Sequence, residues 1–118
     1  VITMLINRYE GNERMSNAVV HNNTIYLSGQ VHAEGDIKEQ TTQVLNKIES
    51  LLNKYNSDKE HILSATIYLK DINKDFADMN SVWDAWIAEG FKPARACVEA
   101  KMARECLLVE ICIIAATK

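Results

Sequence analysis

The amino-acid sequence predicts an α+β protein with six strands and two helices, in the order β-β-β-α-β-α-β-β. Apolar residues recur at helical spacing in residues 36–55 and 75–88, whereas the segments around them are short and rich in β-branched residues. The length of 118 residues suits one domain, which we expect to span residues 1–118. We expect both helices to pack on one face of a six-stranded sheet.

The N-terminal third is predicted to form three strands. Ile2–Tyr9 is apolar and typical of a strand, whereas Glu10–Met15 (EGNERM) is polar and predicts a loop. Ala18–Val20 and Thr24–Leu27 are β-rich segments on either side of the sequence HNN, a pattern that indicates a hairpin. Ser28–Gln30 (SGQ) follows, and its glycine allows a bulge or a close approach of the backbone.

The clearest helix is Asp36–Tyr55, in which Asp36 can cap the first turn. His61–Leu69 then has the character of a strand. A second helix is predicted from Asp75 to Ala88, and Gly90 ends it. Its Met and Trp residues lie at core spacing, which favours packing over cofactor binding.

The last two strands, Ala94–Met102 and Leu107–Ala116, are predicted to form a tight hairpin that turns at Ala103-Arg104. The run LLVEICIIAA is apolar at almost every position, as in strands that are buried on both sides. Two helices cover only one face of the sheet. We therefore expect a second copy of the chain to cover the other face, in a homo-oligomer.

Arg95 lies among small and apolar residues in the segment KPARACVEA. A guanidinium keeps its charge, so Arg95 must reach water, pair with a carboxylate or bind an anionic ligand. In the predicted hairpin, Cys97 lies opposite Glu110 and Arg95 lies opposite Cys112, all on the face away from the helices. Geometry alone leaves an Arg95–Glu110 ion pair and a ligand site equally open, and a one-residue slip would separate these side chains. The other parity is expected to face the helices: Ala94, Ala96, Val98, Val109, Ile111 and Ile113.

Composition excludes several classes of function. The net charge of -3 and the absence of a basic block disfavour nonspecific nucleic-acid binding. No apolar run approaches the roughly 18 residues of a membrane span, and no secretory signal is evident. The odd number of cysteines without metal or disulfide spacing indicates a cytoplasmic protein. No metal site is indicated, and Cys97 is expected to be an inert thiol, because no histidine has the spacing of a Cys-His pair. The three histidines, His21, His32 and His61, are expected to have surface or capping roles.

Several motifs together resemble one known family over essentially the whole chain. The most specific is PARACVEA at Pro93–Ala100, followed by VEI at Val109–Ile111. Supporting motifs are YLSGQV at Tyr26–Val31, TIYL at Thr66–Leu69 and DFADMNSVWDAW at Asp75–Trp86. In this order and spacing they resemble the Rid family of reactive-intermediate deaminases, formerly called the YjgF family.

The resemblance implies a chorismate-mutase-like fold with a mixed sheet, assembled as a homotrimer with clefts between subunits. It implies hydrolysis of 2-imino acids, formed from enamines such as 2-aminoacrylate, to 2-oxo acids and ammonia, without a cofactor. The family arginine that holds the substrate carboxylate matches Arg95, and the cysteine that lines the site matches Cys97. The glutamate that positions the attacking water matches Glu110. The serine of the SGQ motif matches Ser28, and we expect the adjacent backbone at Gly29 to contact the substrate.

Two positions depart from the family pattern. Met15 in the sequence MSNA stands where many active members have a tyrosine, which puts the range of substrates in question. Ala103-Arg104 stands where many members have Leu-Pro at a turn. The alternative function is a noncatalytic trimer that binds 2-oxo or amino acids. Ribonuclease activity, also attached to this family, is disfavoured by the acidic charge balance, and no sequence feature tests a chaperone role.

Overall fold

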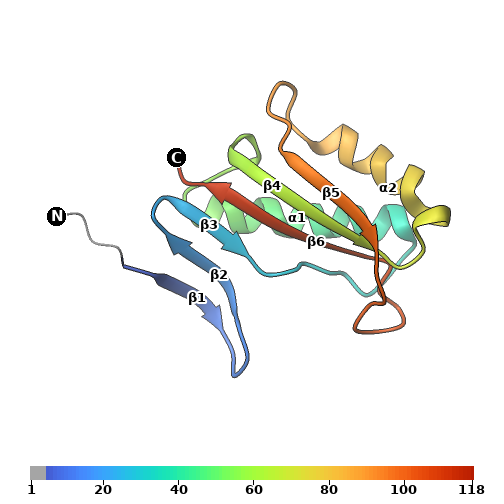
Figure 1. Ribbon diagram of the computed structural model, residues 1–118, viewed down its shortest axis with the longest axis horizontal. Helices are drawn as coiled ribbons and strands as arrows, with labels where there is room; N and C mark the ends of the chain where they lie inside the picture. Colours follow the sequence, from blue (N-terminus) through green and yellow to red (C-terminus); the bar gives the residue numbers. More distant parts are fainter. Residues whose placement is uncertain (1–4) are drawn as a thin grey trace.

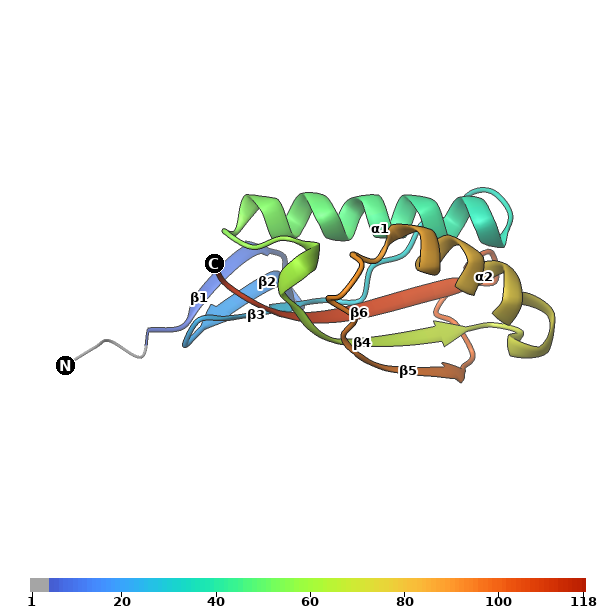
Figure 2. The ribbon, with the colours of Figure 1, turned by 90° about the horizontal axis from the view of Figure 1, so that it is seen from above.

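The computed structural model describes residues 5–118, which form one six-stranded sheet with two helices on the same face (Figures 1 and 2). The strand order is β1-β2-β3-β6-β4-β5. All neighbours are antiparallel except β4 and β5, so the sheet is mixed as expected. The elements are β1 (Asn7–Gly11), β2 (Ser16–His21), β3 (Thr24–Leu27), α1 (Ile37–Lys54), a 3₁₀ turn (Lys59–His61), β4 (Ile62–Leu69), α2 (Ile72–Trp86), β5 (Ala94–Glu99) and β6 (Val109–Ala116).

The three N-terminal strands form two successive hairpins. Asn22 and Asn23 both have positive φ angles, 57° and 62°, which the turn between β2 and β3 requires. The strand β1 extends through Gly11, so the prediction of a loop from Glu10 onward was wrong at its first two residues. The beginning of the predicted strand Ile2–Tyr9 lies outside the described residues.

Aspartate side chains begin both helices. Asp36 Oδ1 accepts a hydrogen bond from Glu39 N at 2.9 Å, which confirms the predicted cap of α1. Asp71 caps α2 in the same way, with Lys74 N at 3.2 Å. Because Asp71 supplies the cap, α2 starts at Ile72. The predicted start at Asp75 was three residues too late, since the prediction did not include this cap.

The hydrophobic core fills the space between the helices and the sheet. Alternate residues of β6, from Val109 to Ala115, are at most 1% exposed on this side. The other residues of β6 are only half-buried, and Tyr26 and Val98 on the same open face are 45% exposed. The open face therefore carries apolar side chains, among them Tyr26 and Val98, that neither helix covers.

The predicted hairpin between the last two strands was wrong. β4 lies between β5 and β6, pairing with β5 in parallel and with β6 antiparallel (Figure 1). β5 follows α2, and a strand that returns through a helix lies parallel to the strand before that helix. Arg95 pairs with Ala65 of β4, and Ala65 pairs with Ile113 of β6. The predicted hairpin had placed Arg95 opposite Cys112. Arg95 and Cys97 thus point to the helix side, while Ala94, Ala96 and Val98 point to the open face.

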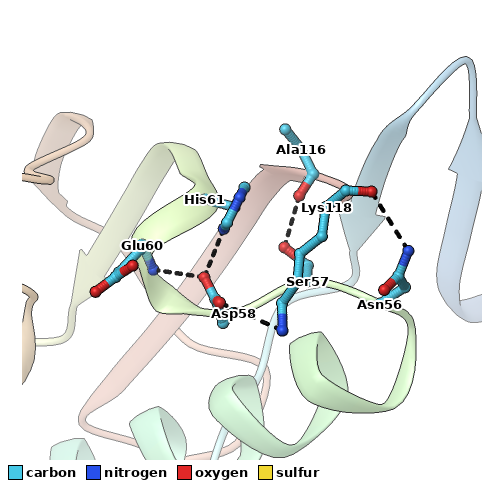
Figure 3. A network of polar contacts seen from close by, with 7 residues as sticks. All are labelled: Asn56, Ser57, Asp58, Glu60, His61, Ala116 and Lys118. Atoms are coloured by element: carbon cyan, nitrogen blue, oxygen red, sulfur yellow. Dashed lines mark hydrogen bonds and ion pairs between the residues drawn. The ribbon is translucent and has the colours of Figure 1, made fainter.

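The loop after α1 is tied to the C-terminal end of the chain (Figure 3). Ser57 is fully buried, and its hydroxyl donates to the Ala116 carbonyl at 2.6 Å. Asp58 accepts from Glu60 N at 3.0 Å and from His61 Nδ1 at 2.6 Å. Lys118 Nζ lies 3.5 Å from the second oxygen of Asp58. The hydrogen bond from His61 is the main cause that lowers the pKa of the Asp58 carboxyl.

We predict that Asp58→Asn lowers the free energy of unfolding at neutral pH, because the substitution removes the charge from these contacts. A carboxyl whose pKa is lowered by folding stabilises the protein above its unfolded pKa, near the reference value of 3.8. This contribution disappears as the pH falls through the lowered pKa of the folded state. Urea unfolding across this range should therefore show the two proteins converging in acid. Asp84→Asn is the control, because Asp84 is exposed on α2, and a difference that persists unchanged in acid would contradict the prediction.

Candidate functional site

Arg95 lies on β5, the edge strand that runs next to α2 in the view of Figure 1. Its side chain reaches toward α2, where Nη1 donates to Asn80 Oδ1 at 2.8 Å. The guanidinium carbon lies 5.5 Å from the centre of the Trp83 ring. The residue is exposed, and no carboxylate of residues 5–118 forms an ion pair with it. The Arg95–Glu110 pair that the sequence left open is therefore not formed within the described chain.

Cys97 lies two residues further along β5, on the same side of the sheet. It is half-buried and packs against the hydrophobic core. Burial raises the pKa of its thiol, and the positive charge of Arg95 opposes this only in part. A thiol with a raised pKa is protonated at neutral pH and is a poor nucleophile.

Glu110 lies on the open face of the sheet, opposite Tyr68 of β4. Gly29 lies directly against it, because a Cβ atom built on Gly29 would approach Glu110 Oε2 to 2.0 Å. Backbone hydrogen bonds of the next residue, Gln30, explain why Gly29 lies so close to Glu110. Gln30 N donates to the Ile111 carbonyl at 2.9 Å, and Ile111 N donates to the Gln30 carbonyl at 3.2 Å. These two bonds hold the SGQ segment against β6, and a side chain at position 29 would require the Glu110 carboxylate to move.

Ser28 belongs to a small polar network beside Gly29. Its hydroxyl donates to Asn17 Oδ1 at 2.7 Å, and Gln30 Nε2 donates to the same oxygen at 3.0 Å. Gln30 is 8% exposed, so its amide is almost withdrawn from water. The Ser28 hydroxyl therefore donates its proton to Asn17, and its oxygen accepts a hydrogen bond from Gln30 Nε2 at 3.3 Å.

A pocket of about 280 Å³ opens beside Glu110. Burial raises the pKa of the Cys112 thiol in this pocket, and the charge of Glu110 adds to the effect. The exposed Lys101 contributes a positive charge to the wall. The lining residues are Tyr68, Ala100, Lys101, Met102, Ala103, Glu110 and Cys112.

The structure thus divides the five predicted site residues into two groups. Ser28, Gly29 and Glu110 lie together at the junction of the SGQ segment with β6. Arg95 and Cys97 lie on the helix side of β5, with β4 between the two groups. The sequence analysis missed the polar partners of these residues, Asn17 and Asn80. Asn17 belongs to the MSNA motif, whereas Asn80 stands three residues before Trp83 and so on the same side of α2.

No group of three or more His, Cys, Asp or Glu side chains among residues 5–118 is arranged to hold a metal ion. No helix within these residues has the length and apolar character that crossing a bilayer requires.

The comparisons with known proteins agree over almost the entire chain. Residues 5–117 match the family model described as Endoribonuclease L-PSP. The RutC family protein YoaB of Escherichia coli is 44% identical over 114 residues, covering 96% of this chain and 99% of that protein. A YjgF-family protein from Neisseria meningitidis has a crystal structure with a TM-score of 0.94 and 48% identity, covering 98% of this chain and 97% of that one. The chain belongs to the Rid family.

More distant Rid relatives share the same architecture. The protein YyfA from Yersinia pestis, a Rid protein of unknown function, is 28% identical with a TM-score of 0.88, covering 96% of this chain and 100% of that one. A chain from Entamoeba histolytica, called a putative endoribonuclease L-PSP, is 32% identical with a TM-score of 0.80, covering 91% of this chain and 90% of that one. The Rid fold is chorismate-mutase-like, as the resemblance implied.

We predict that Gly29→Ala lowers the free energy of unfolding by at most about 1 kcal/mol, because the new methyl group displaces only the carboxylate end of the flexible, half-buried Glu110 side chain. The same substitution should cost less in a Glu110→Ala background, where the carboxylate is absent, and denaturant unfolding of the four proteins measures this coupling. Gly11→Ala is the matched control, because its Cβ meets nothing closer than 3.7 Å. Equal costs in both backgrounds would contradict the contact.

Proposed function

We propose that this Rid-family chain hydrolyses 2-imino acids to 2-oxo acids and ammonia, in clefts between neighbouring subunits of a homotrimer. The observation that carries the proposal is the separation of Arg95 from Glu110. The exposed guanidinium of Arg95 has no carboxylate partner, and Glu110 has no ion-pair partner among the described residues. We expect a second copy of the chain to cover the apolar open face. Such a copy can bring the Arg95 guanidinium of one subunit to the Glu110 carboxylate of another.

Arg95 suits the role of carboxylate clamp. The planar guanidinium offers two parallel N–H donors, which match the two oxygens of a carboxylate. Binding the substrate in this way fixes the distance and direction of its C2 atom from the rest of the site.

Glu110 suits the role of general base and acid. A protonated imine is already electrophilic at C2, so the reaction requires a positioned water and a route for protons. Glu110 accepts a proton as the water oxygen bonds to C2, and the C=N electron pair moves onto nitrogen. The carboxyl then returns the proton to nitrogen. As the C–N bond breaks and ammonia leaves, the hydroxyl on C2 gives its proton to the Glu110 carboxylate, and the O–H electron pair forms the C=O bond of the 2-oxo acid. General acid–base catalysis of this kind typically accelerates a reaction about 10²–10⁴-fold.

The other predicted residues support binding. Ser28 presents an acceptor oxygen, which fits the N–H of a protonated imine, and the Gly29 backbone lies beside Glu110. The half-buried thiol of Cys97 lines the site without forming a covalent bond. The net charge of -3 does not favour RNA as the substrate.

The test of this proposal is the hydrolysis of imines generated by an amino-acid oxidase from several amino acids. We predict that Arg95→Lys and Arg95→Ala both lower kcat/KM by about a hundredfold or more. Lysine keeps the charge but loses the fork, and each charge-assisted hydrogen bond contributes about 1.5–3 kcal/mol. Light scattering on the same samples should give the mass of a trimer. A trimeric Arg95→Ala protein with full activity would defeat the proposal, and tight 2-oxo acid binding without turnover by the native protein would favour the noncatalytic alternative.

A mixing experiment tests the location of the site. We predict that refolding Arg95→Ala together with Glu110→Ala restores activity that neither variant has alone. If Arg95 and Glu110 come from different subunits of a cyclic trimer, about a quarter of the sites in a random mixture are intact. A mixture as inactive as its components would show that the site does not combine these residues from two copies.

We predict that Cys97→Ala retains measurable turnover and remains a trimer, since hydrolysis of a protonated imine needs no thiol nucleophile. The comparison is with Cys106→Ala, because Cys106 is exposed in the loop before β6. Complete inactivity of a correctly assembled Cys97→Ala protein would contradict the assigned role.

A further inference from the structure

Two side chains of α2 contact the Arg95 guanidinium, Asn80 and Trp83. They are three residues apart and so lie on the same side of the helix. Asn80 is half-buried, and its Oδ1 accepts from Arg95 Nη1 at 2.8 Å. Trp83 is 5% exposed, and its ring lies 5.5 Å from the guanidinium carbon. The Arg95 guanidinium thus has a polar partner, Asn80, at one edge and an aromatic partner, the Trp83 ring, nearby.

These contacts restrict the guanidinium in complementary ways. The hydrogen bond to Asn80 limits rotation within the plane of the group, because it fixes one N–H direction. The Trp83 ring attracts the cation and lies against it, which limits tilting of that plane. A guanidinium has five N–H donors, and the structure assigns only one of them to a described acceptor. The others remain free to bind a ligand.

The Trp83 ring is itself held in place by its neighbours. Its centre lies 5.7 Å from that of Trp86, at an interplanar angle of 50°. Trp86 Nε1 donates to Glu49 Oε1 of α1 at 3.1 Å. The support for Arg95 therefore extends through α2 to the longer helix, and both helices are anchored in the core. Such packing makes Trp83 a rigid platform.

We propose that Asn80 and Trp83 are positioning residues that hold the Arg95 side chain ready to bind a carboxylate. This inference rests on the proposed function, because it assigns Arg95 to the substrate carboxylate. An arginine that is already ordered loses less conformational freedom on binding than one that is free in solvent. Asn80 and Trp83 therefore raise affinity for carboxylate ligands without touching the reacting atoms.

Asn80→Ala is the main test, with 2-oxobutanoate as the carboxylate probe in isothermal titration calorimetry. We expect Kd to rise about three- to tenfold, the effect of ordering one long side chain. In steady-state assays KM should rise by a similar factor while kcat stays near the native value. Binding of the neutral methyl ester should change by less than twofold. The matched control is Ser81→Ala, whose hydroxyl bonds to the Asp78 carbonyl on the exposed side of α2.

The role of the ring is tested by two substitutions that keep the position apolar. Trp83→Phe keeps an aromatic face and should leave Kd for 2-oxobutanoate within about twofold of the native value, whereas Trp83→Leu should weaken binding more. Thermal unfolding and light scattering identify variants that fold and assemble. If Trp83→Leu fails to assemble, the comparison of Asn80→Ala with Trp83→Phe still decides the question.

A double-mutant cycle separates positioning from a general structural effect. In an Arg95→Lys background the fork is absent, so adding Asn80→Ala should change 2-oxobutanoate binding by less than twofold. If Arg95→Ala abolishes binding but Asn80→Ala keeps the native Kd and KM, the inference about Asn80 is overturned and the proposed function stands. Equal weakening of the acid and the ester would also overturn it, since a structural defect does not discriminate between them. If Arg95→Ala binds 2-oxobutanoate normally, the proposed function itself fails, and the inference fails with it.

Discussion

The position of β4 between β5 and β6 determines where Arg95 and Cys97 lie relative to Glu110. The parallel pairing of β4 with β5 results from the return of the chain through α2. This pairing turns Arg95 and Cys97 toward α2, and it leaves Glu110 on the open face. An antiparallel hairpin of the same two segments would have placed all three on one face. The division of charge between two surfaces thus follows from the connection through α2.

Local signals in the sequence predicted the elements well. The order of strands and helices, the Asp36 cap and the core positions of β6 were all confirmed. The helix start at Ile72 was missed, although Asp71 is a cap of the same chemical kind as Asp36. Such features depend on a few adjacent residues, and the sequence displays them directly.

The pairing of β5 was predicted wrongly because β5 was paired with the next strand along the chain, although the predicted strand–helix–strand order favours a parallel pair with β4. Six residues of β5 are compatible with either neighbour, because the segment is short and alternates small with polar or apolar residues. The choice of β4 over β6 comes from the connection through α2, and no pattern within β5 itself specifies it. The contact of Gly29 with Glu110 was equally hidden, since it joins residues far apart in the chain. The family resemblance supplied the candidate site residues, which stay a prediction, whereas the geometric argument placed Arg95 and Cys97 on the wrong face.

The central position of β6 also has a consequence for how the chain folds. β6 pairs with β3 on one side and with β4 on the other, and its contacts with β3 join residues about as far apart as Thr24 and Ala116. Until β6 is added, the hairpins of β1–β3 have no hydrogen-bonded connection to the β4–β5 pair. Contacts so distant in sequence form slowly, because a long loop must close first. During synthesis, the earlier strands therefore emerge as two incomplete sheets with unpaired edges, and the two are joined only after β6 has been made.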